Sequence, residues 1–293
     1  MPDFLQRDQA PLRGDQWTAL DQAVVQTARA ILVGRRFITL VGPFGPGVEA
    51  LPSDSLAGTT AGQIDLLGNA EGEAVGIEQR RYLPLPLIYK DFWVHWRELE
   101  ANRQFGLPLD TGKAAAAAAT CAQTEDRLVF DGDTTLGLPG LRNVDGRQAP
   151  AMRDWGQAGQ AFADVVDGVR LLTVHGFPGP YALVVSPQLY AQLNRIFANT
   201  GVLELEQVEK LARRGVYPTG ILPEPSALLV DSGAQNMDLA VALDLSAAFV
   251  ESTNLSYRFR VLESLVLRIH RPGAICTFEP PAGETGGETR RRA

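Results

Sequence analysis

The 293-residue chain contains few of the residues that build metal sites and covalent cross-links. It has two cysteines, Cys121 and Cys276, and three histidines, His95, His175 and His270. Two cysteines are too few for a disulfide framework or a cysteine-based zinc site, so we expect both to be buried, reduced thiols. The histidines lie far apart in the sequence, without the short spacing of a metal-binding helix. We therefore predict no metal site.

Basic charge and long apolar runs are also scarce. The formal net charge is −7, and the arginine pairs are short and widely separated. This argues against a nucleic-acid partner, because binding to phosphates needs a basic stripe. The first residues contain no apolar segment after a basic start, and no run is long enough to cross a membrane. We expect a cytoplasmic protein without a membrane partner.

Catalytic motifs are missing, and the nearest matches are weak. The block Gly42–Gly47 (GPFGPG) lacks the Gly-Lys-Ser/Thr ending of a phosphate-binding loop. Ser186 is expected at a strand-to-helix turn, where hydrolases carry their nucleophile, but no glycine flanks it. A serine that caps a helix explains this position. We predict no catalytic residue, and keep a hydrolase that uses Ser186 as an alternative.

Apolar spacing predicts a mixture of helices and strands, which is an α+β chain. Helices are expected near residues 15–33, 95–105, 111–130, 154–174, 186–198 and 204–214, and strands near 36–41, 181–185, 227–231, 239–245, 257–270 and 274–278. The strand at 257–270 would span on the order of 45 Å, longer than most strands, and suits a broad plate. The helix at 111–130 contains six successive alanines, which allow close packing.

A long segment of low regularity follows the first predicted strand. It opens with Gly42, Pro43, Gly45, Pro46 and Gly47, and its few apolar residues are scattered among polar ones as far as residue 80. A structureless loop of this length is unusual inside a compact domain. We interpret the segment as an arm that is buried against another chain, with the glycines and prolines as its hinge.

Several segments, taken in order, resemble the encapsulin shell proteins, which form bacterial nanocompartments. After the amphipathic first helix, the resemblance rests on Leu32–Val48, Pro86–Arg103, Ala122–Asp133, Gly179–Leu193, Met237–Phe249 and Phe259–Glu279. It covers nearly the whole chain and is nearest to the branch with ferritin-like, iron-handling cargo. It implies the HK97-type fold of phage major capsid proteins, with a peripheral domain, an axial domain and an extended loop arm.

The resemblance also implies a division of the chain. Residues 1–41 would form the N-terminal helix and the start of the peripheral domain, 42–80 the arm, 81–133 the peripheral domain with its long helix, 134–224 the axial domain, and 225–280 the C-terminal strands of the peripheral domain. Residues 281–293, rich in Gly, Glu, Thr and Arg, are expected to be a disordered tail.

The function implied by the resemblance is that of a non-enzymatic subunit of an icosahedral shell. The shell would enclose a ferritin-like or peroxidase cargo, serving iron storage or oxidative-stress defence, through a C-terminal targeting peptide of the cargo. The alternative within the same fold is a phage or prophage major capsid protein. No cofactor is expected: Arg97 falls where some relatives have a flavin-binding tryptophan.

Two sites follow from the resemblance. The cargo-peptide groove would involve Arg35, Phe37, Thr39, Leu245, Ala247 and Phe249. The five-fold pore would be lined by Asn199, Thr200, Gly201, Glu204 and Glu206. The two glutamates could form a carboxylate ring that concentrates cations. Alternatively, they are favourable charges at a helix N-terminus.

Overall fold

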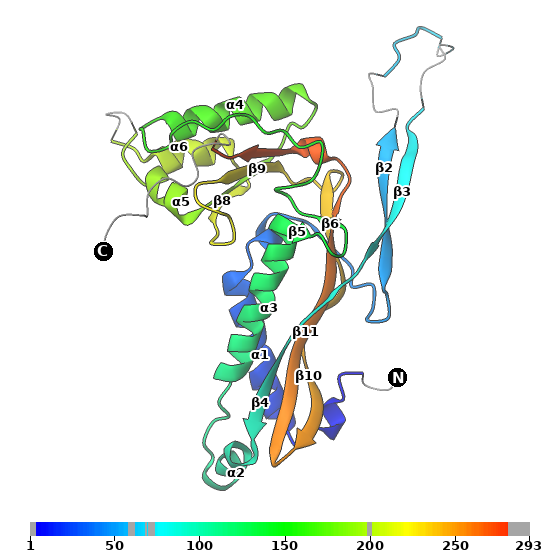
Figure 1. The fold of residues 1–293 in the computed structure, drawn as a ribbon, viewed down its shortest axis with the longest axis vertical. Helices are drawn as coiled ribbons and strands as arrows, with labels where there is room; N and C mark the ends of the chain where they lie inside the picture. The colour runs from blue at the N-terminus through cyan, green and yellow to red at the C-terminus, as the bar shows by residue number, and fades with distance from the viewer. Residues whose placement is uncertain (1–3, 58–61, 68, 70–73, 198–200, 281–293) are drawn as a thin grey trace, which may run out of the picture.

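The computed structural model describes residues 4–57, 62–67, 69, 74–197 and 201–280. Figure 1 shows a long lower part built on a sheet, an upper part with a second sheet, and a two-stranded ribbon that projects to one side. One continuous set of buried apolar residues runs through both parts.

The lower sheet contains the longest strands. Its order is β1 (Leu40–Val41), β10 (Met237–Thr253), β11 (Ser256–Ile269) and β4 (Leu87–His95). β1 runs parallel to β10, and the other pairs are antiparallel. The predicted strand at 257–270 is therefore confirmed, and β10 extends well beyond the predicted 239–245 because its second half also pairs with β11.

Two helices cover one face of this sheet, α1 (Gly14–Ile31) and α3 (Gly112–Asp131), while α2 (Trp96–Phe105) follows β4 at the far end. α1 buries a stripe of residues spaced three and four apart: Trp17, Leu20, Val24 and Ala28. The alanines of α3 allow close approach, since Ala114, Ala117 and Ala118 are buried between the helix and its neighbours.

The upper sheet has the order β12 (Ile275–Phe278), β9 (Ala227–Asp231), β7 (Tyr181–Val185) and β8 (Gly215–Pro218). Its helices are α4 (Gln160–Val174), α5 (Pro187–Leu193) and α6 (Glu204–Leu211). The predicted division is wrong at one point. β9 and β12 fall within residues 225–280, which were assigned to the peripheral domain, yet they pair in this upper sheet.

Two parts of the arm are regular strands. β2 (Ala50–Ala57) and β3 (Gly76–Pro84) form an antiparallel ribbon in which Asp54 lies opposite Arg80. The chain between the two main parts adds the short pair β5 (Gly132–Asp133) and β6 (Leu138–Pro139). The 3-10 turns are η1 (Arg7–Gln9), η2 (Gly34–Arg36) and η3 (Pro272–Ala274). No helix of the described residues has the length and apolarity that crossing a membrane requires.

Several predicted boundaries are wrong for reasons that lie outside the local sequence. The strand expected at 36–41 is reduced to β1, because residues 34–36 form η2, whose backbone is held by a carboxylate of α3. α4 begins at Gln160 instead of Asp154, and α5 ends at Leu193 instead of Ala198. The caps of the first two long helices are Arg13 and Thr111 rather than Asp15 and Asp110.

Candidate functional site

A cavity of about 370 Å³ lies between α1 and the middle of β10. Apolar side chains line much of it, and charged groups stand at its rim. The lining residues are Val25, Ala28, Arg29, Leu32, Arg35, Arg36, Leu40, Asp244 and Leu245. Because α1 supplies the wall and β10 the opposite side, the cavity forms where the first helix meets a C-terminal strand.

An irregularity in β10 directs two residues toward this cavity. The pairing with β11 passes from Leu243 opposite Ser264 to Ser246 opposite Leu262. Asp244 and Leu245 therefore share a single opposing residue, Glu263, which is the pattern of a β-bulge. Leu245 packs against the small apolar cluster beneath α1. The bulge thus brings one apolar and one acidic side chain to the cavity.

Arg35 connects the cavity to the protein interior. Its Nε and Nη2 donate to the two carboxylate oxygens of Glu125 over 2.7 and 2.8 Å, and Nη2 also donates to Glu263 over 3.0 Å. Its Nη1 donates to Asp244 over 2.7 Å. Burial alone would raise the pKa of Asp244, but the hydrogen bond from Arg35 holds it below its ordinary value. The guanidinium is therefore fixed by three carboxyl groups on three elements.

A fourth carboxyl group holds the backbone that carries Arg35. Asp126 of α3 is buried and accepts hydrogen bonds from the N–H groups of Val33 (2.9 Å) and Gly34 (2.9 Å). Burial raises the pKa of Asp126 to about 6, against the opposing effect of these N–H groups. The turn between α1 and β1 is thus fixed from α3.

The predicted groove residues divide into two groups. Arg35 and Leu245 line the cavity. Phe37 does not, because it is buried between the rings of Phe130 and Tyr217. Thr39 is not part of the lining, and its carbonyl accepts from the backbone N–H of Leu239.

Ala247 and Phe249 are also buried, and the N-terminal segment lies along this part of β10. The backbone N–H of Phe249 donates to the carbonyl of Leu5 over 2.9 Å, and Arg7 donates to the carbonyl of Ala247. Sequence reasoning missed Val25 and Leu40, which line the cavity instead. The sequence could have indicated both. Val25 is an apolar residue outside the buried stripe of α1, and Leu40 is an apolar residue at the start of the short strand β1.

Glu204, predicted to line a pore, lies in the interior of the subunit. It is fully buried, and its carboxylate accepts from the backbone N–H groups of Gly159 (3.2 Å) and Phe162 (3.0 Å) at the start of α4. Arg195 approaches it to 3.5 Å. The prediction of a pore carboxylate is therefore wrong for this residue, and the charge-at-a-helix-terminus alternative describes it, although the helix is α4 rather than its own.

The structure describes two of the other four predicted pore residues. Gly201 and Glu206 are exposed. Asn199 and Thr200 lie outside the described residues. The ends of the loop are joined by a bridge between Ile196 and Leu203.

The proposed hinge begins in a fixed conformation. Gly42 has a φ of +125°, and a Cβ atom there would lie 2.3 Å from the carbonyl oxygen of Val241, so only glycine fits. The N–H groups of Phe44 and Gly45 donate to the carbonyls of Val241 and Ala242. The block therefore anchors the root of the arm to β10, while Gly47 has open space around it.

The groups considered for other chemistry are enclosed. Ser186 is fully buried and its hydroxyl faces the N–H of Ser226, so it is not an exposed nucleophile. Burial raises the pKa of both Cys121 and Cys276 to about 12, and both are free thiols as predicted. In the described part of the chain, no three His, Cys, Asp or Glu side chains are grouped so that they could hold a metal ion.

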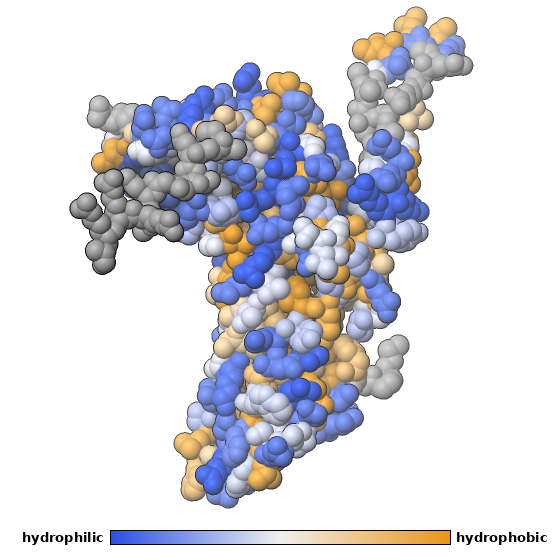
Figure 2. Space-filling view, in the orientation of Figure 1, coloured by the Kyte–Doolittle hydropathy of each residue, from blue (hydrophilic) through white to orange (hydrophobic). Residues whose placement is uncertain are grey.

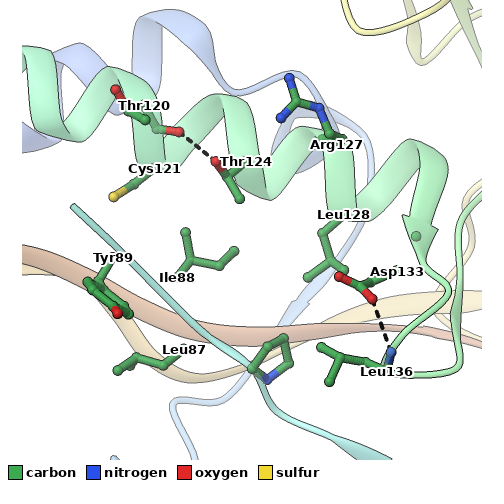
Figure 3. Close-up of a pocket in the computed structure, with 12 residues that line it drawn as sticks. Leu87, Ile88, Tyr89, Thr120, Cys121, Thr124, Arg127, Leu128, Asp133 and Leu136 are labelled. Atoms are coloured by element: carbon green, nitrogen blue, oxygen red, sulfur yellow. Dashed lines mark hydrogen bonds between the residues drawn. The ribbon is translucent and has the colours of Figure 1, made fainter.

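A second cavity, of about 360 Å³, lies between α3 and the free edge of β4. Figure 3 shows Ile88 and Leu128 between the helix and the strand, with Asp133 and Leu136 at one end. The hydroxyl of Thr124 is turned to the carbonyl of Thr120 within the helix. Much of the lining of this cavity is apolar, and its charged residues are Arg127 and Asp133.

Comparison with known proteins gives a consistent result. Residues 2–266 match the family model described as encapsulating protein for peroxidase. The chain is 45% identical over 292 residues, covering all of both chains, to the type 1 encapsulin shell protein EncA of Myxococcus xanthus. It is 40% identical over 265 residues, 90% of this chain and 73% of the relative, to a diheme-cytochrome-encapsulin shell fusion protein of Kuenenia stuttgartiensis.

Solved structures show the same architecture. A virus-like particle protein from Pyrococcus furiosus matches with a TM-score of 0.73 at 19% identity, covering 91% of this chain and 99% of that one. The capsid protein of the Myoviridae phage XM1 matches with a TM-score of 0.62 at 15% identity, over 84% of this chain and 90% of that one. The α+β, HK97-type capsid fold is therefore shown.

Proposed function

Because this chain belongs to the encapsulin family of shell proteins, we propose that its copies close into an icosahedral compartment around a cargo enzyme. The observation that carries the proposal is the projecting ribbon. Near its tip, Ile64 and Leu66 are almost fully exposed in the single chain and Leu67 is largely exposed, and Figure 2 shows hydrophobic residues gathered there. Apolar surface on a protruding arm is stabilised when a neighbouring copy covers it.

Electron microscopy of the purified protein tests the proposal directly. Hollow particles of uniform diameter are expected at neutral pH. A population of monomers and small oligomers only would contradict a closed shell. The phage-capsid alternative predicts particles that contain DNA, so nuclease treatment and nucleic-acid absorbance of the same sample distinguish the two.

We assign the two four-stranded sheets of the subunit to its two domains. The lower sheet with α1 and α3 would be the peripheral domain, and the upper sheet with α4, α5 and α6 the axial domain that meets its copies around symmetry axes. The exposed residues Gly201 and Glu206 would then line a pore. If Glu206→Gln leaves iron uptake into loaded shells equal to that of Glu209→Gln, a role in cation entry is contradicted.

The cavity between α1 and β10 is the proposed docking site for the targeting peptide of the cargo. Its support is its lining: Leu32, Leu40 and Leu245 offer apolar contacts, while Arg35 and Asp244 offer polar ones. An apolar groove with a few convergent polar groups is the usual form of a peptide or ligand site. The cargo would be a redox enzyme, ferritin-like or a peroxidase, in agreement with the description of the matching family.

The groove is tested by introducing a charge. Leu245→Glu should yield shells of normal size with strongly reduced co-purified cargo, because a buried carboxylate opposes an apolar peptide. Leu107→Glu, at an exposed leucine beyond α2, serves as the matched control. Cargo is measured as its mass ratio to shell protein in purified particles, and equal ratios in both variants would rule out this docking site.

A further inference from the structure

Two buried carboxyl groups share a single cation beneath the cavity between α1 and β10. Glu125 of α3 and Glu263 of β11 both have fully buried side chains, and both accept hydrogen bonds from the single guanidinium of Arg35. Asp244, which is exposed, accepts a hydrogen bond from Nη1 of Arg35. The second oxygen of Glu263, Oε1, is buried and finds no hydrogen-bond donor among the described residues.

The surrounding charges do not balance this excess. Arg35 of η2 contacts the pair directly. The positive charges of Arg36 and Arg29 stabilise other carboxylates instead, Arg36 that of Asp126 and Arg29 that of Asp244. The other titratable groups that α3 brings to this region are Asp126 and the thiol of Cys121. The positive charge of Lys90, on β4, interacts with that thiol. Arg35 is therefore the one cation that the described residues place against the pair, and it is shared with a third carboxyl group.

In a desolvated site with one cation, burial and like charge oppose the ionisation of a second carboxyl group, so the pair holds a proton at neutral pH and loses it only at alkaline pH. Burial, and next the adjacent Glu125, raise the pKa of Glu263 above its ordinary value. A proton on this pair would also supply the donor that Oε1 of Glu263 lacks. Geometry, charge balance and the unpaired oxygen point to the same protonated state.

We propose that Glu125 and Glu263 share one proton, and that loss of this proton at alkaline pH draws Arg35 away from Asp244 and loosens the floor of the cavity. The proton leaves for solvent, and the group of Arg35, Glu125, Glu263 and Asp244 passes from one net negative charge to two. The added charge lies between α3 and β11, whose separation it favours. The consequence for cargo rests on the function proposed above, whereas the shared proton does not.

The sign of the pH effect follows from proton linkage. A carboxyl group whose pKa is higher in the folded than in the unfolded chain makes the fold most stable below its unfolded pKa. Stability then falls as pH rises toward the folded pKa, by up to about tenfold in the folding equilibrium per pH unit. Glu263→Gln cannot ionise, so this loss disappears from the variant.

Assembled particles of wild type, Glu263→Gln and a matched control test the shared proton. The control is Glu251→Gln on β10, an isosteric change at a partly exposed glutamate that pairs with Arg258 over 3.0 Å. Infrared difference spectra at about pH 8, where Asp126 is ionised, should show a protonated carboxyl band in wild type and in the control, and none in Glu263→Gln. Absence of the band from wild type overturns the proposal without need of any variant.

Thermal melting of the same particles between about pH 5 and about pH 9 gives the second readout. Relative to wild type, Glu263→Gln should gain stability steadily with rising pH, while Glu251→Gln follows wild type. If Glu263→Gln does not fold, Glu125→Gln replaces it, since either amide removes the second carboxyl group. Parallel pH curves for wild type and the folded variant would overturn the proposal.

Hydrogen exchange over residues 33–38 and 243–247 tests the link to the cavity. Protection in wild type should fall across the same alkaline range in which the carboxyl band disappears, and should persist in Glu263→Gln. If the band titrates while protection stays constant, the link between the proton and the cavity is overturned. The cargo ratio of Leu245→Glu decides separately whether the cavity binds cargo.

Discussion

Buried carboxylates in this protein serve mainly to hold the backbone of distant elements. Asp126 accepts from the turn after α1, Glu204 from the start of α4, and Asp164 from the N–H of Arg153 and the indole of Trp155. Each satisfies N–H groups that would otherwise be buried without partners. The presence of an acidic residue in this sequence therefore does not by itself indicate that the residue is exposed or lines a pore.

Asp126 gives a prediction about pH. Its pKa is raised to about 6 by burial, so its contribution to stability is greatest below the ordinary pKa of an aspartate and is lost as pH rises through about 6. Asp126→Asn does not titrate. The difference in melting temperature between wild type and Asp126→Asn should therefore narrow between about pH 4 and about pH 6, by the equivalent of at most about 3 kcal/mol. A constant difference would show that Asp126 does not titrate in this range.

Glu204 gives a prediction about the upper part of the molecule. Glu204→Gln keeps the shape but turns an amide donor toward the N–H groups at the start of α4, so it should cost about 1–3 kcal/mol. Glu206→Gln, two residues away and exposed, should stay within about 0.5 kcal/mol of wild type. Differential scanning calorimetry compares the pair. Equal melting temperatures would contradict the buried role of Glu204.

At the level of elements, the sequence predicts those whose signal is local. The apolar spacing of α1, the alternation in β11 and the capping position of Ser186 led to the correct element types, and the resemblance led to the correct fold. Missed features depend on partners distant in the chain. The backbone of η2 is held by a hydrogen bond to Asp126. The start of α4 is fixed by Glu204, which accepts a hydrogen bond from a backbone N–H of its first turn. The bulge at Asp244 is defined only by the pairing of β10 with β11.

The candidate site was only partly predictable for the same reason. Arg35 and Leu245 were identified through the resemblance, but Phe37, Ala247 and Phe249 are buried by contacts with other elements. Alternation along a strand does not tell which face a second layer covers. Here the segment around Leu5 and Arg7 lies along the second half of β10, and only the folded chain shows this.

Close packing of α3 against its neighbours gives a prediction for that helix. Ala118 is fully buried, whereas Ala116 in the same alanine run is exposed. Ala118→Leu should overpack the contact and cost about 1–3 kcal/mol. Ala116→Leu, with the same change in volume and helix propensity, should stay within about 0.5 kcal/mol. Thermal melting of both variants makes the comparison, and a stable Ala118→Leu would show that the packing is loose.

For the whole molecule, the ribbon is separate from the structure that folds around the core. Val48, Leu51 and Leu83 at its root pack against the core, while Ile77 and Tyr82 on β3 are exposed. Figure 1 shows the ribbon leaving the body beside the upper end of the lower sheet. Folding of the subunit and assembly of the shell should therefore depend on different parts of the arm.

This separation can be tested by shortening the ribbon. Asp54 and Arg80 are opposite each other and form an ion pair with an N–O distance of 2.7 Å. Replacing residues 55–79 with Asn-Gly would close the ribbon there, because this dipeptide favours the tight turn of a two-residue hairpin. The root residues remain, so the shortened subunit should keep its secondary structure and cooperative melting, but should form no closed shells.

The matched control installs the same turn at the other long hairpin. Asn254 and Leu255 already form the two-residue connection of β10 and β11, with φ values of 50° and 61°. Leu255→Gly creates Asn-Gly where a positive φ is required, so it should retain shells and stability. Electron microscopy and size-exclusion chromatography compare the two variants. Closed shells from the shortened chain would show that the contacts holding the compartment lie in the body of the subunit, and the exposed leucines of the ribbon would then need another explanation.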